Sequence, residues 1–357
     1  MGDFPHRARG TQVSRIRPRS RATVVVAILI AAFWSLAGCG NSDNSPDSLP
    51  ATSSAGDDTA FPVSIEHFYG ETTISARPKR IVALGSTDFE ILYALGVVPV
   101  GIATYPGFGA TNDDGIQPWV EPYVDATVTT FLPDGDQSVE QIAALDPDLI
   151  LMTYGTLGEN SYRQLSRIAP TVGSPGGDWT LDWRLQLRTV ARAVGMTDKA
   201  ENLEAQLSNG IGELRTAHPE LDGKTFSFVE VHPEGIWAYL SGDPRNGLIQ
   251  ELGLLPSPGI RALDESTGGK FVGDVSYELA GEIDADIIVV QAPSQSAQSI
   301  RDAPIFGELN TVKSGAAILY GKDDLAFLGS MVPSPLTIPA FTQRFVTDAS
   351  EAATHIR

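Results

Sequence analysis

The 357-residue chain contains a single cysteine, Cys39, and only five histidines. Without a second thiol, no internal disulfide can form. The histidines lie far apart in the sequence, whereas zinc and manganese sites combine clustered imidazole and carboxylate ligands. We therefore expect no site at which side chains bind a metal ion directly, and no thiol chemistry at any position other than Cys39.

The motifs of several enzyme classes are also missing. The chain has no Gly-x-Ser-x-Gly elbow, no P-loop and no Gly-x-Gly-x-x-Gly. Two pairs of acids, Asp146/Asp148 and Asp284/Asp286, are the only pattern that a glycosidase hypothesis could start from. Both pairs directly precede an apolar run, and loop turns whose carboxylates accept backbone hydrogen bonds explain them better. We expect a protein that is not an enzyme.

Positive charge is scarce outside the N-terminus. Residues 1–38 hold six of the 25 Lys and Arg but one of the 44 Asp and Glu, so the rest of the chain has 19 basic and 43 acidic residues and a formal net charge of −24. So acidic a surface repels nucleic acid and anionic headgroups and favours neutral or cationic partners. Simple solubility would also account for most of this charge.

A signal peptide is the first feature that the sequence does contain. Six arginines precede the apolar stretch 22–36, and Leu36-Ala37-Gly38-Cys39 follows. A basic start, a short apolar run and small residues before a cut are typical of secretory signals, whereas a membrane span needs about 20 apolar residues. We predict a signal peptide over residues 1–38. Residues 39–60 contain a single large hydrophobe and are expected to form a disordered tether.

A repeated segment divides the remainder. Residues 138–152 and 276–290 both read Ser-x-Glu, then Leu or Ile, then Asp-x-Asp and an apolar run of the kind buried on both faces of a parallel sheet. Each serine is expected to cap a helix, which places Glu140 and Glu278 in a first turn that favours negative charge. The repeat predicts two pseudo-equivalent α/β lobes.

A long amphipathic segment separates the two copies. Its apolar residues recur every three or four positions and form one stripe: Ala200, Leu203, Leu207, Ile211 and Leu214. Such a helix would be about 30 Å long. The predicted organisation is an N-terminal α/β lobe over 61–196, a connecting helix over 197–218, a C-terminal α/β lobe over 219–347 and a tail over 348–357.

Three segments resemble the substrate-binding lipoproteins of ABC importers, above all the iron–siderophore binders, whose relatives carry vitamin B12 or haem. They are residues 78–84, 90–96 and 138–152. The resemblance implies a class III-type periplasmic-binding fold, in which two α/β lobes with central, mostly parallel sheets are joined by one long α-helix. It further implies that the cleft between the lobes captures a ferric siderophore and that the protein delivers this ligand to a membrane permease.

The N-terminal segment carries a resemblance of its own. Leu36-Ala37-Gly38-Cys39 resembles the lipobox of bacterial lipoproteins, which implies cleavage before Cys39 and a diacylglycerol on its sulfur. Two or more acyl chains hold a protein stably on a membrane. The protein is thus expected to be exported and anchored by lipid to the extracytoplasmic face of the cell membrane. A stray thiol beside an ordinary cleavage site is the alternative.

The family resemblance also implies site residues. One glutamate of each lobe would dock into the permease, and by position in the motif these are Glu140 and Glu278; the simpler alternative is that both only stabilise helix N-termini. Ligands of α/β folds bind beyond the carboxyl ends of the strands. The candidates there are Ser86, Thr87, Tyr105, Tyr154, Trp237, Tyr239, Arg245, Phe271, Phe327 and Ser330.

Aromatic walls with a few hydrogen-bond donors suit a bulky, partly apolar and oxygen-rich ferric complex. Tyr154 and Phe271 match aromatic positions of hydroxamate-siderophore binders, although any one aromatic could instead pack in the core. Arg245 could meet a ligand carboxylate or pair with Asp243 in a turn. Haem, held by Tyr105, Tyr154 or His232, or cobalamin remain alternative ligands, and a non-transporting envelope scaffold is an alternative role.

Overall fold

The computed structural model describes residues 58–105, 109, 115–133, 138–232 and 235–356. The predicted signal peptide, Cys39 and most of the predicted tether lie outside these residues. Within the described ranges, no helix is both long and apolar enough to cross a bilayer.

The N-terminal lobe is built on a five-stranded parallel sheet with the order β5-β4-β3-β6-β7. Its strands are β3 (Ile81–Ala83), β4 (Gly101–Thr104), β5 (Thr130–Pro133), β6 (Leu149–Met152) and β7 (Thr171–Gly173). Leu149, Ile150 and Leu151 are fully buried, as expected of a strand covered on both faces. The remaining elements are the antiparallel strands β1 (Val63–His67) and β2 (Gly70–Ile74) and the helices α1 (Asp88–Ala94), α2 (Val139–Ala144), α3 (Glu159–Leu165) and α4 (Trp183–Ala193).

The C-terminal lobe contains a six-stranded mixed sheet with the order β11-β9-β8-β12-β13, in which the short β10 also pairs with β8. β8, β10, β12 and β13 run parallel, whereas β9 and β11 are antiparallel to their neighbours. The strands are β8 (Thr225–His232), β9 (Gly235–Tyr239), β10 (Leu255–Pro256), β11 (Val272–Val275), β12 (Ile287–Gln291) and β13 (Ala317–Tyr320). The helices are α6 (Pro244–Glu251), α7 (Pro258–Thr267), α8 (Ala297–Arg301), α9 (Asn310–Ser314), α10 (Leu325–Ser330) and α11 (Ile338–Ala353).

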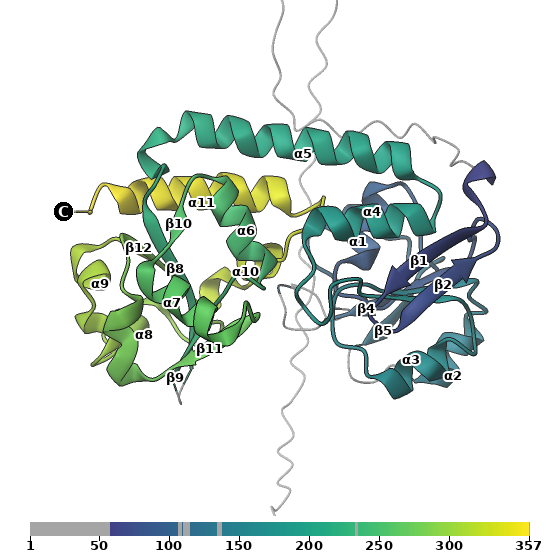
Figure 1. Cartoon of the computed structure of the whole chain (residues 1–357), viewed down its shortest axis with the longest axis horizontal. Helices are drawn as coiled ribbons and strands as arrows, with labels where there is room; N and C mark the ends of the chain where they lie inside the picture. The colour runs from purple at the N-terminus through teal and green to yellow at the C-terminus, as the bar shows by residue number, and fades with distance from the viewer. Residues whose placement is uncertain (1–57, 106–108, 110–114, 134–137, 233–234, 357) are drawn as a thin grey trace, which may run out of the picture. The chain divides into compact units, whose positions relative to one another are not determined.

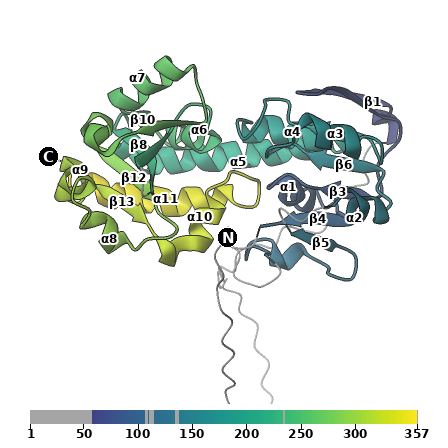
Figure 2. The same ribbon diagram turned by 90° about the horizontal axis from the view of Figure 1, so that it is seen from below.

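Helix α5 (Thr197–Ala217) connects the lobes. It buries Ala200, Leu207 and Ile211 of the predicted stripe and packs against α4 of the N-terminal lobe and α11 of the C-terminal lobe. α5 (teal) runs beside α11 (yellow) in both Figure 1 and Figure 2. The predicted fold class, two α/β lobes joined by one long helix, is confirmed.

The repeated acids hold corresponding strands in place. Asp148 accepts hydrogen bonds from the backbone N–H groups of Lys79 and Arg80 at 2.8 Å each, at the start of β3. Asp286 accepts 2.8 Å hydrogen bonds from the backbone N–H and the hydroxyl of Thr225, at the start of β8. The second aspartate of each pair therefore anchors the neighbouring strand in the same way in both lobes, as expected of turn residues whose carboxylates accept backbone hydrogen bonds.

Two details differ from the sequence-based expectations. Residues 348–353, expected to begin a tail, continue α11, because Ala349 and Ala352 are buried in the core and extend its apolar face. The segment after Ser276 is not an α-helix but a 3₁₀ helix over Tyr277–Ile283, and the Ser276 side chain does not cap its backbone as expected.

Candidate functional site

A cavity of about 510 Å³ is lined by residues of both lobes. This volume lies within the range of ordinary small-molecule sites, about 300–1,000 Å³. In the N-terminal lobe the lining residues follow strand ends, since Ser86 comes after β3, Tyr105 after β4 and Tyr154 after β6. The complete lining is Ser86, Tyr105, Tyr154, Trp179, Glu230, Tyr239, Arg245, Phe271, Gln291 and Val332.

The N-terminal wall of the cavity is aromatic. The Tyr154 ring meets Trp179 edge to face, with the ring centroids 5.3 Å apart. The Trp179 indole N–H donates to the Thr156 hydroxyl at 2.8 Å, and the Tyr105 hydroxyl donates to the Leu84 carbonyl at 2.9 Å. Burial raises the pKa of Tyr154, so that its phenol stays protonated.

Ser86 is different, because its hydroxyl oxygen is buried and has no hydrogen-bond partner among the described residues. A buried polar group without a partner costs free energy, and such groups in native structures often await a ligand or water. Since Ser86 is also among the residues that line the cavity, its hydroxyl is a candidate donor to a bound molecule.

Arg245 forms the centre of the C-terminal wall. Its Nε donates to both oxygens of the fully buried Asp243 at 3.0 Å, and one terminal nitrogen donates to Asp243 at 2.5 Å. The other terminal nitrogen reaches the Gln291 side-chain oxygen at 3.1 Å. The guanidinium also lies over the rings of Tyr239 and Phe228, at 4.2 and 4.7 Å from their centroids. Arg245 therefore both pairs with Asp243 and lines the cavity.

A carboxylate stands beside this arginine. One Glu230 oxygen accepts hydrogen bonds from the Tyr239 hydroxyl at 2.7 Å and from the Gln291 amide. Phe271 closes the wall with an edge-to-face contact to Tyr239 at 5.7 Å. Burial raises the pKa of Tyr239, which keeps the phenol protonated and able to donate to Glu230.

Six of the ten predicted ligand-binding candidates line the cavity: Ser86, Tyr105, Tyr154, Tyr239, Arg245 and Phe271. Four do not. The buried Thr87 hydroxyl bonds to Gln186 at 3.0 Å, and Trp237 packs at a tilt against His232 with the ring centroids 4.7 Å apart. Phe327 packs against Tyr320 and Phe341 in the core. Ser330 donates a hydrogen bond to the Phe327 carbonyl at 2.7 Å. Both residues therefore stabilise the position of α10.

Four lining residues were not among the predicted candidates: Trp179, Glu230, Gln291 and Val332. Glu230 has a signal in the sequence, since it is the one charged residue in the otherwise apolar run 228–231. Gln291 ends the β12 run in the same way and pairs with Glu230 in register. Trp179 has no such signal, because its position depends on a left-handed backbone with φ of 59°.

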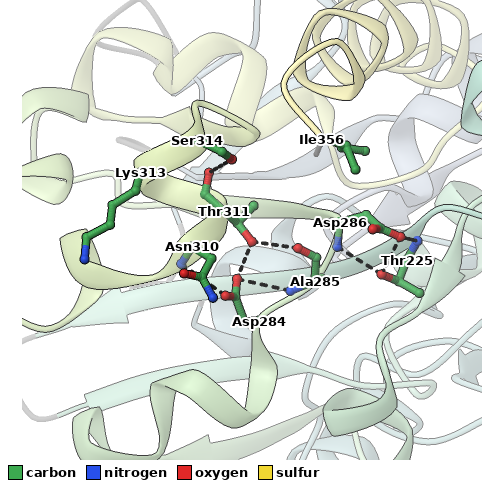
Figure 3. A pocket seen from close by; sticks show the side chains of 9 residues that line it. All are labelled: Thr225, Asp284, Ala285, Asp286, Asn310, Thr311, Lys313, Ser314 and Ile356. Carbon is green, nitrogen blue, oxygen red and sulfur yellow. Dashed lines mark hydrogen bonds between the residues drawn. The ribbon is translucent and has the colours of Figure 1, made fainter.

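A second cavity, of about 650 Å³, lies in the C-terminal lobe at the ends of the central strands where β8 and β12 begin. Figure 3 shows that its acids bond to the protein itself. Asp284 accepts from the backbone N–H groups of Ala285 and Asn310 at 3.2 and 3.1 Å, and Asp286 is held by Thr225. Nowhere in the described ranges do three His, Cys, Asp or Glu side chains group as metal ligands. The cavity between the lobes is therefore the candidate ligand site.

The two repeated glutamates are both exposed at helix N-termini. Glu140 lies in the first turn of α2, where Ser138 and Gln141 form a reciprocal capping box with bonds of 3.0 and 3.1 Å. Glu278 lies in the first turn of the 3₁₀ helix. A hydrogen bond from its own backbone N–H, together with one from the Ser276 side chain, lowers the pKa of Glu278 and keeps it ionised. Neither glutamate lines the cavity between the lobes.

Comparison with known proteins points to one family. The family model for periplasmic binding proteins matches residues 81–323. The Fe(3+)-citrate-binding protein YfmC of Bacillus subtilis is 24% identical over 303 residues, which is 83% of this chain and 88% of that protein. The probable siderophore-binding lipoprotein YfiY of the same organism is 29% identical over 222 residues, or 61% of this chain and 60% of YfiY.

Among solved structures, Streptococcus pneumoniae PiaA in complex with ferrichrome has the same fold. It superposes with a TM-score of 0.73 at 25% sequence identity, covering 83% of this chain and 100% of PiaA. Since the matched share of both chains is so large, the similarity extends over both lobes and α5.

Proposed function

The chain belongs to the periplasmic binding protein family, and on that premise we propose that it captures a ferric siderophore and delivers it to the permease of an ABC importer. Members of this family bind solutes and are not enzymes. The similarity to proteins named for ferric citrate, siderophore and ferrichrome binding supports an iron complex as the ligand class.

One observation carries the proposal: the cavity of about 510 Å³ is walled by aromatic rings and holds an arginine and an unpartnered hydroxyl. A ferric siderophore presents apolar edges around a core of iron-bound oxygens. The rings of Tyr105, Tyr154 and Phe271 would contact the edges, while Arg245 and Ser86 would donate to the oxygens. The iron would arrive already chelated, as cargo, so the absence of a cluster of metal-ligating side chains within the described ranges fits this ligand.

Quenching of tryptophan fluorescence tests this function. Trp179 stands in the cavity wall, so a bound ferric complex, which absorbs strongly, is expected to quench its emission in a saturable way. The Trp179→Phe variant should lose most of the quenching, whereas Trp119→Phe, outside the lining, should retain it. A response to haem or cobalamin but to no ferric siderophore would replace the proposed ligand, and no response to any of them would favour the scaffold role.

We further propose that Glu140 and Glu278 dock into basic pockets of the permease, one from each lobe. Replacing both by alanine is expected to abolish siderophore-dependent iron uptake in cells while the purified variant keeps its ligand affinity, because neither residue lines the cavity. Glu159→Ala is the matched control, since Glu159 is also an exposed acid in the first turn of a helix. Retained uptake in the double variant would refute docking and leave helix stabilisation as the role of both.

We also propose where the protein is located in the cell envelope. Residues 1–38 would direct export, a lipid on Cys39 would hold the protein on the extracytoplasmic face of the membrane, and residues 40–60 would give the binding lobes reach. The lipoprotein name of YfiY supports this arrangement. An anchored protein stays near its permease, which raises its effective concentration there.

A further inference from the structure

Charge is distributed unevenly over the cavity wall. Among its described lining residues, Arg245 and Glu230 are the ones that carry a formal charge at neutral pH. Arg245 makes three hydrogen bonds to Asp243, and these two side chains are 8% and 0% exposed. Its positive charge is therefore largely balanced by Asp243, although the Arg245 side chain still lines the cavity.

The negative charge of Glu230 is not balanced in the same way. Its two hydrogen-bond donors, the Tyr239 hydroxyl and the Gln291 amide, are neutral. They fix the position of the carboxylate without cancelling its charge. Counting Asp243 behind the wall, the three charged groups around the cavity leave a net charge of −1.

We propose that Glu230 sets the charge class of the ligand, so that the cavity selects neutral or cationic ferric complexes and rejects those that carry free carboxylates. This inference rests on the proposed function and narrows it. Charges inside a partly dry cavity interact more strongly than in bulk water, so one fixed carboxylate is enough to separate ligands of equal size and opposite charge. A repulsive group of this kind gives specificity without adding affinity for the correct ligand.

Three iron complexes of different charge test the proposal: cationic ferrioxamine B, neutral ferrichrome and anionic ferric citrate. Their dissociation constants would be measured with the intact protein, and each affinity would be expressed relative to that of ferrichrome. The unaltered protein is expected to bind ferrioxamine B at least about tenfold more tightly than ferric citrate. The ratio of ferrioxamine B affinity to ferric citrate affinity should fall when the salt concentration is raised.

In Glu230→Gln, the ratio of ferrioxamine B to ferric citrate affinity is expected to fall by about tenfold or more, because the glutamine keeps the size and the acceptor but loses the charge. Glu230→Asp keeps the charge and should retain the preference for ferrioxamine B over ferric citrate. It is the control for the case in which Glu230→Gln does not fold. Glu66→Gln removes the same charge from an exposed position on β1 and should leave the ratio unchanged.

Two results would overturn the inference while leaving the proposed function intact: preferential binding of ferric citrate by the unaltered protein, or an unchanged ratio in Glu230→Gln. If a folded protein bound none of the three complexes and no other ferric siderophore, the proposed function and this inference would be overturned together.

Discussion

Replacing Arg245 by methionine is expected to destabilise the protein by about 3–5 kcal/mol, because it leaves a buried carboxylate without its counter-charge. Asp243 is fully buried, and three of its hydrogen bonds come from the Arg245 side chain. Asp243 also caps α6 through the backbone N–H of Arg245 at 2.8 Å, so the orphaned charge would lie at the start of that helix. Urea unfolding would measure the loss.

The same substitution is expected to weaken ligand binding by at least about thirtyfold. Arg245 is buried, central and stacked on two rings, which are the properties of a residue whose truncation costs about 2 kcal/mol or more. Arg245→Lys should recover part of the stability but little of the affinity, because an ammonium cannot reproduce the planar, forked contact. Titration with a ferric siderophore would measure both variants.

The double variant Asp243→Asn/Arg245→Met separates the two roles of Arg245. With both charges removed, much of the lost stability should return, while the lost affinity should not. If Arg245→Met were as stable as the unaltered protein, the pair would not be a structural ion pair, and if it bound the ligand normally, Arg245 would not be a ligand contact.

The fold could be predicted from the sequence because its strongest sequence patterns are local and occur in both lobes. Residues 149–151 and 287–290 are continuous apolar runs that are fully buried, and the aspartate directly before each run, Asp148 or Asp286, accepts hydrogen bonds from the neighbouring strand. The stripe of α5 is likewise a periodic pattern that needs no long-range information. The C-terminal end of α11 was missed because alanines such as Ala349 and Ala352 give only a weak apolar signal.

The ligand site could be predicted only in part from the sequence, because the ends of strands indicate a region of the fold but not the direction in which each side chain points. Ser86 and Thr87 are neighbours, yet Ser86 lines the cavity whereas Thr87 is buried and bonds to Gln186. Phe327 also follows a strand, but it packs into the core against α11. Glu230 and Gln291 become one unit only through the register of β8 with β12, 61 residues apart.

Glu90 is a buried acid of the N-terminal lobe that the ligand site does not use. It is 3% exposed on α1 and accepts hydrogen bonds from the Trp119 indole at 3.0 Å and from the Ser334 hydroxyl. Ser334 lies between α10 and α11, so this carboxyl group joins two segments that are far apart in the chain. Burial raises the pKa of Glu90 from 4.5 to about 7, although both hydrogen bonds act in the opposite direction.

Because the pKa of Glu90 is higher in the folded than in the unfolded chain, its contribution to stability is fully present below about pH 4.5 and is lost as the pH rises to about 7. The shift corresponds to about 3 kcal/mol. Glu90→Gln, which is neutral at every pH and keeps an acceptor and a donor, should therefore gain stability relative to the unaltered protein between pH 5 and pH 8. Urea unfolding across this range would measure the difference, with Glu66→Gln as an exposed control that should follow the unaltered protein. Parallel pH profiles for Glu90→Gln and the unaltered protein would contradict this, because they would show that the pKa of Glu90 is the same in the folded and the unfolded chain and that its two hydrogen bonds offset its burial.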